Sequence, residues 1–169
     1  MRNDLISDDE DLALKEGPQY LLFYLRATLF ALRAEDIAEI VELPNITTVP
    51  WMQTSVKGVC NIRGSVIGVV DTARTLMDKD CEISKKSSLI IVNKSYANKN
   101  EKIGLIVDEV FEIEVFIDQD MQEIPKHGLS VNAKFVESII SYEKKFIPLL
   151  DLNSIVDIDA LSKRVNDEN

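Results

Sequence analysis

Apolar and polar residues alternate along most of this chain with a period of two, which is the pattern of half-buried β-strands. The clearest stretch is 56–71, where two segments rich in β-branched residues flank the polar break Arg63-Gly64-Ser65. Cys60 and Ile62 fall on one face of the first segment, because the side chains of a strand alternate between its faces. Gly64 suits a turn position with positive φ, where a Cβ would clash. The stretch therefore predicts a β-hairpin, which needs further strands to bury its apolar face.

Other segments of the chain supply such strands. Strands are expected at residues 20–25, 28–32, 37–43, 88–93, 135–142 and 146–150, with one or two strands in 103–113 and polar loops at 95–101 and 119–132. Residues 34–36 are expected to form a helical turn. Short helices are expected at 72–77 and 152–156, because the aspartates that precede them, Asp71 and Asp151, suit N-cap positions. The pattern is that of a mainly all-β protein with a few short helices.

The second half of the chain repeats the first. A shift of 80 positions places Val56 on Val136, Val59 on Ile139, Cys60 on Ile140, Ile62 on Tyr142, Ile67 on Ile147, Val69 on Leu149, Val70 on Leu150 and Asp71 on Asp151. Upstream, a smaller shift lays residues 35–40 over residues 108–113. The repetition predicts two similar β units. Closing each unit into a small barrel would remove most unpaired strand edges.

Length and charge limit the class of protein. With 169 residues the chain forms one domain, or two small ones that share a core. A net charge of −10 argues against nucleic-acid binding and against docking on an anionic membrane, because both need basic residues. No apolar run approaches the roughly 18 residues that span a bilayer, and no signal peptide opens the chain. We expect a cytoplasmic location without direct membrane insertion.

Both ends of the chain are expected to lie outside the folded unit. Residues 1–18 are acidic and end at Gly17-Pro18, which predicts a flexible arm with a turn of helix at 11–15. Residues 158–169 are expected to form a C-terminal tail. The folded unit is thus expected at residues 19–157.

Enzyme signals are weak throughout the chain. His127 is the single histidine and lies in a polar loop with no nucleophile signature near it, so a solvated side chain is expected. The acidic clusters lack the spacing of a calcium loop, and no glycine-rich phosphate cradle precedes a helix. Cys60 is expected to be a buried small hydrophobic residue and Cys81 a free thiol in a polar loop. We expect no catalytic residue, no metal ligand and no cofactor.

Glu39 and Arg63 are the charged residues that stand out. If the strand of Glu39 lies beside the strand that leads to Arg63, the two side chains face each other as a cross-strand pair. Such a pair is either an exposed ion pair worth about 0–1 kcal/mol or an oriented guanidinium at a protein interface, where arginine is a favoured anchor. The equivalent residues of the second unit are Glu112 and Glu143, so the pair is not expected to be repeated.

The stretch 56–64, with sequence VKGVCNIRG, resembles the signature of CheW-like domains, and VIGVVD at 66–71 resembles the strand that follows it. The family pattern is apolar-x-G-apolar-x-N-L-R-G, then a strand of the form apolar-apolar-P-apolar-apolar-D-L. The segments 20–25, 38–40, 103–108 and 146–152 fall in the family's order, so the resemblance covers about 19–157. Gly68 stands where the family has proline, although Pro148 keeps that place in the second copy, and Thr72 stands where leucine is usual.

The resemblance implies a fold and a function. The fold would consist of two interlocked five-stranded β-barrel subdomains, at about 19–80 and 86–157, with a short helix after each barrel hairpin. Proteins of this family are adaptors and not enzymes. They join the cytoplasmic tips of methyl-accepting chemoreceptors to a CheA-type histidine kinase in signalling arrays, which serve flagellar chemotaxis or type IV pilus motility. The alternative left open is a small metabolite-binding protein or enzyme with a site between the subdomains.

The resemblance also implies which residues meet the partners. The positions expected to face the kinase are Ile37, Glu39, Lys57 and Gly58. Arg63 and Gly64 match the arginine-glycine turn of the family, which is implicated in coupling to the receptor. All six residues fall in the first half of the chain, so the two halves are expected to have similar structures and different roles.

Overall fold

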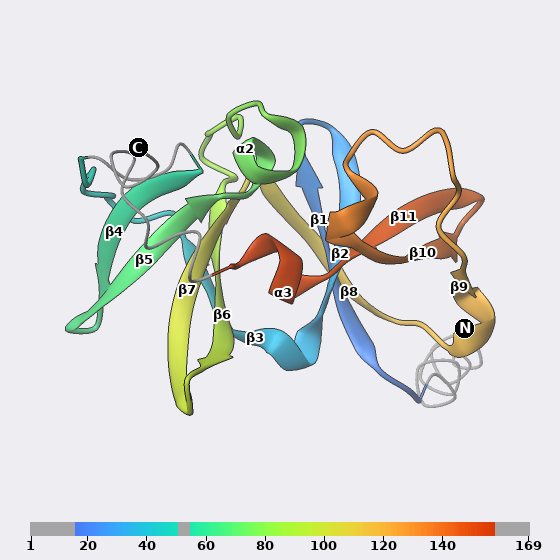
Figure 1. Cartoon of the computed structure of the whole chain (residues 1–169), viewed down its shortest axis with the longest axis horizontal. Coiled ribbons are helices and arrows are strands. Elements are labelled where there is room, and N and C mark those ends of the chain that lie inside the picture. Colours follow the sequence, from blue (N-terminus) through green and yellow to red (C-terminus); the bar gives the residue numbers. More distant parts are fainter. Residues whose placement is uncertain (1–15, 51–54, 158–169) are drawn as a thin grey trace, which may run out of the picture.

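In the computed structural model of this chain, the description covers residues 16–50 and 55–157 and is mostly β-structure (Figure 1). The helical turn expected at 11–15 and the tail expected at 158–169 lie outside these residues. The first half contains β1 (Gln19–Leu25), β2 (Thr28–Arg33), the 3₁₀ turn η1 (Ala34–Asp36), β3 (Ile37–Glu42), β4 (Val56–Ile62), β5 (Ser65–Asp71) and α2 (Thr72–Met77). The second half contains β6 (Ser88–Tyr96), β7 (Lys99–Val107), β8 (Glu109–Val115), η2 (Asp118–Asp120), β9 (Met121–Gln122), η3 (Ala133–Phe135), β10 (Val136–Tyr142), β11 (Lys145–Leu150) and α3 (Leu152–Ile155).

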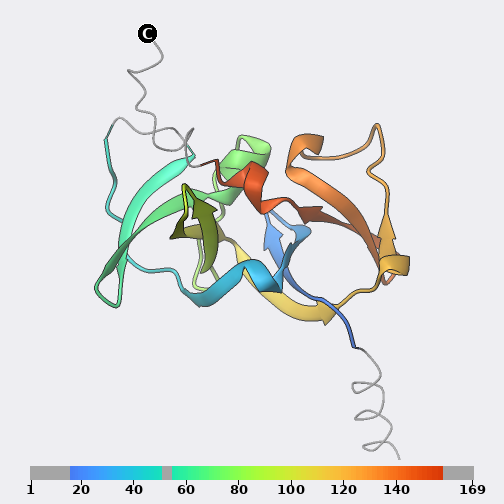
Figure 2. The ribbon, with the colours of Figure 1, turned by 60° about the horizontal axis from the view of Figure 1, so that its bottom comes forward.

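The strands form two sheets that exchange their hairpins. The six-stranded sheet has the order β8-β1-β2-β11-β10-β9, and the five-stranded sheet has the order β3-β6-β7-β5-β4. The first hairpin of each half therefore lies in the sheet that the other half completes. Each sheet takes strands from both of the ranges expected as subdomains, 19–80 and 86–157. Figure 2 shows the two sheets side by side, with α2 and α3 together between them.

The repeat seen in the sequence extends to the pairing of the strands. Cys60 pairs with Ile67 between β4 and β5, and Ile140 pairs with Ile147 between β10 and β11. In both hairpins the pairing register shifts directly after the first residue pair. The shift lies between Val56 and Gly58 in one hairpin and between Val136 and Ser138, the equivalent positions, in the other. In each sheet this hairpin then joins the exchanged hairpin through a parallel pairing, of β5 with β7 or of β11 with β2. The prediction of two similar β units is thus confirmed.

The expectation of two closed five-stranded barrels is not confirmed. One sheet has six strands, and among the described residues no strand pairing joins its edge strands β8 and β9. Those edges are linked by the chain itself, which passes from β8 through η2 into β9. In the five-stranded sheet, the segment after β3 reaches β4 through a single bridge of Thr47 with Val59.

Four hairpins turn through two residues that both have positive φ, as in type I′ turns. They are Arg26-Ala27, Arg63-Gly64, Ala97-Asn98 and Glu143-Lys144. The expected polar loop at 95–101 is wrong, because β6 and β7 continue into it and meet at Ala97-Asn98. The long loop expected at 119–132 is interrupted by the short strand β9. The segment 103–113, expected as one or two strands, belongs to two, which are separated at Asp108.

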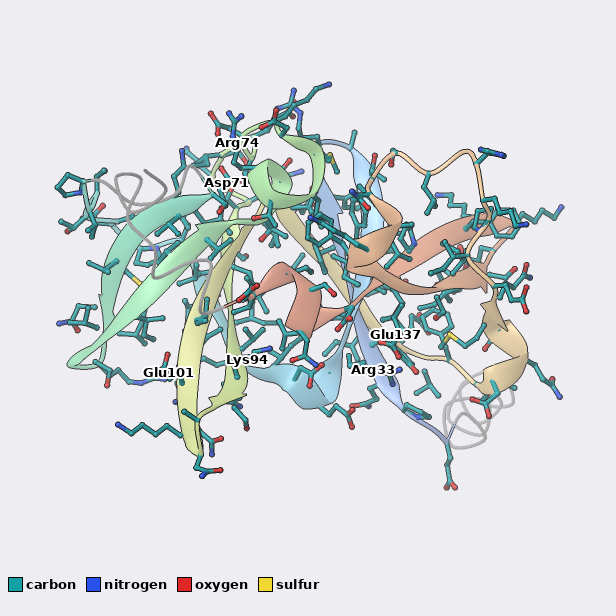
Figure 3. The ribbon with its side chains drawn as sticks, in the orientation of Figure 1. Arg33, Asp71, Arg74, Lys94, Glu101 and Glu137 are labelled. Atoms are coloured by element: carbon teal, nitrogen blue, oxygen red, sulfur yellow. The ribbon has the colours of Figure 1, made fainter. Side chains whose placement is uncertain are left out.

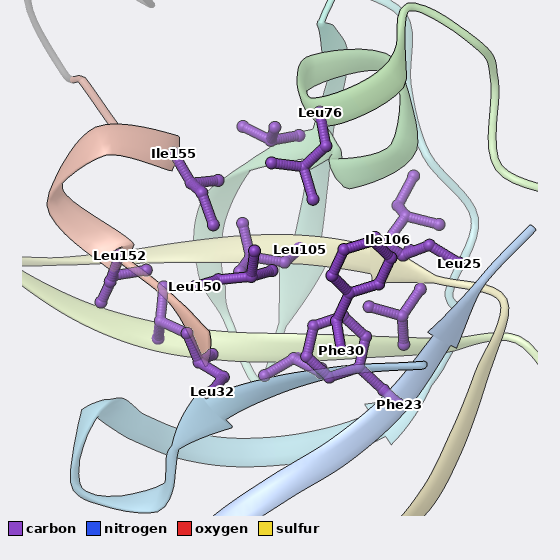
Figure 4. Packing of buried hydrophobic residues seen from close by; sticks show 14 of the residues in the cluster. Phe23, Leu25, Phe30, Leu32, Leu76, Leu105, Ile106, Leu150, Leu152 and Ile155 are labelled. Atoms are coloured by element: carbon purple, nitrogen blue, oxygen red, sulfur yellow. The ribbon is translucent and has the colours of Figure 1, made fainter. Parts of the chain in front are cut away.

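The hairpin of β1 and β2 is buried on both faces. The larger hydrophobic cluster includes Leu21, Phe23, Leu25, Phe30 and Leu32 of this hairpin, Val70, Ile103, Leu105 and Ile106 of the five-stranded sheet, Leu76 of α2, and Leu150, Leu152, Ile155 and Val156 (Figure 4). The smaller cluster comprises Tyr20, Leu22, Ala31, Phe116, Ile140, Ile147 and Leu149. The hairpin therefore separates the two clusters and contributes to both, which ties the sheets into one packed body.

Two aspartates cap the short helices, as predicted. The Asp71 carboxylate accepts a hydrogen bond from the backbone N of Arg74 at 3.0 Å, and Asp151 accepts one from the N of Asn153 at 3.0 Å. Asp71 is fully buried and also accepts from the N of Cys81. Cys60 is buried as predicted, and Cys81 is a free thiol in a loop as expected. Cys81 is nevertheless buried, and its thiol donates to the carbonyl oxygen of Ile106. Burial raises the pKa of the Cys81 thiol well above its usual range.

No helix in the described residues is long and apolar enough to cross a membrane.

We predict that Phe30→Ala lowers the free energy of unfolding by about 3–5 kcal/mol. Phe30 has no exposed surface and lies on the exchanged hairpin, so the cavity would open in the larger cluster. Urea unfolding followed by circular dichroism measures the change. Phe146→Ala is the control, because Phe146 is 68% exposed and its loss should change stability by about 0.5 kcal/mol or less. Equal effects of the two substitutions would contradict this account of the core.

Candidate partner-binding site

The ion pair of Glu39 and Arg63 closes one end of the five-stranded sheet. Glu39 lies on β3 and Arg63 follows β4, and these are the two edge strands of the sheet. The contact was expected if the two strands lay side by side, but they are not paired with each other, because β6, β7 and β5 stand between them in the pairing order. The side chains meet all the same, with the Arg63 guanidinium donating to the Glu39 carboxylate, so the sheet curls until its edges approach.

Exposure differs between the two members of the pair. The Arg63 side chain is 71% exposed and the Glu39 side chain 24%. The hydrogen bond from Arg63 lowers the pKa of Glu39, and the same bond raises the pKa of Arg63. Glu39 therefore holds one side of the guanidinium while the rest faces solvent, where a partner can reach it.

The turn that carries Arg63 is fixed by its own residues. Arg63 has φ 50° and Gly64 has φ 86°. The N–H of Gly64 donates to the Asn61 Oδ1 at 2.9 Å, so the asparagine of the VKGVCNIRG stretch closes the turn from within. A Cβ on Gly64 would meet no atom within 4 Å, which leaves open space around the tip.

Gly58 allows the chain after β3 to cross β4 at close range. Its φ is 149°, and a Cβ there would stand 1.9 Å from the carbonyl oxygen of Thr47. Next to it, the N–H of Val59 donates to that same oxygen at 2.9 Å, and the N–H of Thr47 donates to the Val59 oxygen at 2.8 Å. Gly58 therefore acts through the backbone, and its absence of a side chain is what permits the bridge.

The remaining two predicted residues are half-buried and contact other parts of the protein. Ile37 is half-buried, pairs with Val92 and packs against the larger cluster. The Lys57 Nζ lies 4.0 Å from the buried Asp71 carboxylate, at the opposite end of β4 from Arg63. The structure thus joins Glu39 with Arg63, and it leaves Lys57 apart from that pair.

The second half replaces the ion pair by a different link. Glu112 on β8 stands where Glu39 stands in the repeat, and it accepts a hydrogen bond from the Tyr142 hydroxyl at 3.0 Å. Glu114 accepts from the same hydroxyl at 3.3 Å. Desolvation, followed by these carboxylates, raises the pKa of Tyr142. The ion pair is not repeated, as expected. What is repeated is a side-chain contact between the glutamate strand, here β8, and the hairpin of β10 and β11.

Sequence reasoning missed a set of exposed apolar side chains at repeated positions. Val66 is 72% exposed, and Phe146, its equivalent under the shift of 80, is 68% exposed. Ile40 and Ile113, equivalent under the smaller shift, are 38% and 55% exposed. Strand alternation alone does not show that these residues lie outside the core, whereas their exposed fractions do. Such side chains are typical of protein interaction surfaces.

The described residues offer little for chemistry. His127 is exposed in its loop, and no group of three potential metal ligands occurs among residues 16–50 and 55–157. The ion pair of Arg33 and Glu137, which joins β2 to β10, and the contacts of Arg74 with Asp78 and Asp80 are exposed (Figure 3). These charges connect neighbouring elements at the surface.

We predict that Gly58→Ala destabilises the protein more than Gly64→Ala. The Gly58 Cβ would collide with backbone and displace the bridge to Thr47, whereas Gly64→Ala meets only the penalty of positive φ, about 1–2 kcal/mol. Gly68→Ala is the matched control, because its Cβ enters open space without positive φ. Urea midpoints of the three variants give the order, and a Gly58→Ala midpoint at or above that of Gly64→Ala would be evidence against the close crossing.

We also predict that Arg63→Ala raises the pKa of Glu39. In the wild type this pKa lies below its usual value, so the pair adds stability above the unfolded-state pKa and loses it as the pH falls through the folded-state pKa. A carboxyl-carbon NMR titration of both proteins measures the shift. The pKa of Asp80, which the hydrogen bond from Arg74 lowers, should stay the same in the variant. An unmoved Glu39 titration would mean that the pair does not persist in solution.

The amino-acid sequence of this chain is similar to a known domain family and to several of its members. The family model of the CheW-like domain matches residues 19–160. The chain is 23% identical over 155 residues to the chemotaxis protein CheW of Bacillus subtilis, covering 92% of this chain and 97% of that protein. It is 28% identical over 104 residues to protein PilI of Pseudomonas aeruginosa, covering 61% of this chain and 56% of PilI.

A solved structure extends the likeness to three dimensions. The scaffolding protein TtCheW from Thermoanaerobacter tengcongensis superposes with a TM-score of 0.75 at 26% identity. The match covers 89% of this chain and 94% of that protein. With the family model matched from the first strand to beyond the last helix described, the chain belongs to the CheW-like domain family.

Proposed function

We propose that this protein is a non-enzymatic adaptor that couples membrane chemoreceptors to a CheA-type histidine kinase in a cytoplasmic signalling array. The observation that carries the proposal is the CheW-like match over residues 19–160, together with the fold shared with a scaffolding protein. The relatives named as chemotaxis proteins support the same role. In this view each sheet curls into a barrel-like unit that its side-chain link closes.

The proposed division of the surface follows the predicted residues. Ile37, Glu39, Lys57 and Gly58 form or support the face toward the kinase, and Arg63 with Gly64 couples to the receptor. Arg63 supports this assignment best, because its guanidinium is exposed on a turn held by Glu39 and Asn61. Arginine at the centre of an interface often contributes a large part of the binding energy. The contribution of Gly58 is indirect, because it permits the close crossing of the Thr47 backbone over β4.

The mechanism is mass action between weak sites on one rigid body. Each contact would bury about 1,000–1,600 Å² in total. Two contacts on one small protein raise the effective concentration of kinase near receptor. Because both sets of residues lie on the five-stranded sheet, its packed strands would carry a displacement at one contact to the other.

The alternative of a metabolite-binding protein or enzyme is not favoured. The valine groove, lined chiefly by Val56, Val59, Val66, Gly68, Val70 and Ile103, has a volume of about 610 Å³. It lies on the five-stranded sheet and not between the two sheets. Its walls carry few of the convergent polar groups that fix a small ligand.

The pathway is open between flagellar chemotaxis and type IV pilus motility, because the relatives include both CheW proteins and PilI. Co-sedimentation with receptor signalling tips of each pathway, with and without kinase, tests the adaptor role and distinguishes the two. Recruitment of the kinase to receptor assemblies only in the presence of this chain is the expected result. Kinase recruitment that does not depend on the chain would remove the adaptor role.

We predict that Arg63→Glu lowers the amount of kinase in the sedimented complex by about tenfold while leaving the fold intact. The substitution reverses the exposed charge and places two carboxylates together at the end of the sheet. Glu143→Lys is the matched control, because Glu143 occupies the equivalent turn of β10 and β11 and its charge also changes by two. A complex unchanged by Arg63→Glu would remove Arg63 from the site.

A further inference from the structure

The valine groove exposes apolar surface that nothing in the described residues covers. Val66 at its rim is 72% exposed, and a Cβ on Gly68 would meet no atom within 4 Å. In the six-stranded sheet, the position equivalent to Gly68 holds Pro148, which is buried. Gly68 therefore leaves a hollow in the middle of β5, at the position where the equivalent strand β11 has the pyrrolidine ring of Pro148.

The chain beyond the described residues carries a pattern that fits such a groove. Ile158, Leu161 and Val165 are spaced three and four residues apart, which places them on one face of a helix. The residues between them are mostly polar, and Lys163 and Arg164 stand near the end of the segment, where cations favour a helix C-terminus. An amphipathic segment of this kind gains stability only by covering its apolar face.

The described chain ends next to the groove. Ile155 and Val156 are buried in the larger cluster together with Val70 and Ile103, which also line the groove. Lys94 of β6 donates to the Asn153 side chain of α3, and Lys94 pairs with Glu101 of β7 at the groove's edge (Figure 3). The coloured trace after α3 runs toward β7 and β5 in Figures 1 and 2.

The dimensions also agree. Residues 158–165 as a helix would rise about 10 Å. The groove wall from Val66 to Val70 on β5 spans about 13 Å. A segment tethered at this point has an effective concentration of about millimolar for a nearby site, which an untethered partner reaches only at high abundance.

We propose that the protein's own C-terminal segment, residues 158–165, docks in the valine groove. Ile158, Leu161 and Val165 lie against the strip formed by Val59, Val66 and the hollow at Gly68. The docked segment covers part of the hairpin of β4 and β5. This inference stands on the groove and the sequence pattern and does not depend on the adaptor function.

Hydrogen exchange of the full chain, read by mass spectrometry of peptides covering 158–165, tests the proposal. In the wild type these amides should exchange about tenfold or more slowly than in Leu161→Asp, which places a charge on the apolar face. Val66→Glu on the groove rim and Gly68→Leu, which fills the hollow, should give the same loss of protection. Phe146→Glu, at the equivalent exposed position of the other sheet, is the matched control and should leave the protection unchanged.

The variants separate the possible outcomes. Unchanged exchange of the buried amides of β6 verifies that each variant is folded, and Val66→Glu changes only an exposed side chain. Wild-type amides that exchange as fast as those of Leu161→Asp would overturn the proposal. Protection that survives both groove substitutions, or that appears only after kinase is added, would overturn it as well, because the groove would then hold something other than this segment.

Discussion

The hairpin of β1 and β2 has no face that can be left in water. One face supplies Phe23 and Phe30 to the larger cluster, and the other supplies Leu22 to the smaller one. Its strands are hydrogen-bonded to strands of the second half, because β1 pairs with β8 and β2 pairs with β11. The first half of the chain therefore cannot bury its own hairpin, and neither sheet is complete without the other half. This exchange makes two repeated units behave as one body.

The buried carboxylates of Asp71 and Asp108 fix the loop that connects the two halves of the chain. Asp108, at the break between β7 and β8, accepts from the backbone N of Arg26 at 2.6 Å and from that of Glu82 at 2.9 Å. Asp71 accepts from the N of Cys81 at 3.2 Å. The turn of the exchanged hairpin and the connection between the halves are thus held by the ends of two strands of the five-stranded sheet. Because Cys81 lies between these anchors, it is drawn into the core although its sequence surroundings are polar.

Local signals predicted most of the strands and both helix caps, since alternation and an aspartate before a helix need no distant partner. The exchange of hairpins depends on contacts between residues far apart in sequence, so alternation could not reveal it. The strands through 95–101 were missed because their side chains are polar, and Ala97-Asn98 is a weak signal for a turn with positive φ. The contact of Glu39 with Arg63 was predicted on the condition that their strands lie side by side, whereas β3 and β4 are the opposite edges of the sheet. Curling of the sheet produces it instead.

The curled ends also explain how equivalent halves acquire different surfaces. Each sheet needs a side-chain link between its first strand and its far hairpin, and the repeat fixes a glutamate, Glu39 or Glu112, on the first strand. Arg63 completes one link from an exposed turn, so that end presents a cation. Tyr142 completes the other from a half-buried strand, and the turn beyond it presents Glu143. That second turn also carries Lys144, and Lys145 follows it, so its charges are mixed. The two ends therefore share a backbone but differ in their side chains: one displays an arginine held by a glutamate of the first strand, and the other ties its glutamate to a tyrosine and, among the described residues, leaves its turn charges unpaired with that strand. A repeated fold can in this way present two different surfaces, because the link that closes each sheet also decides which side chain its hairpin exposes.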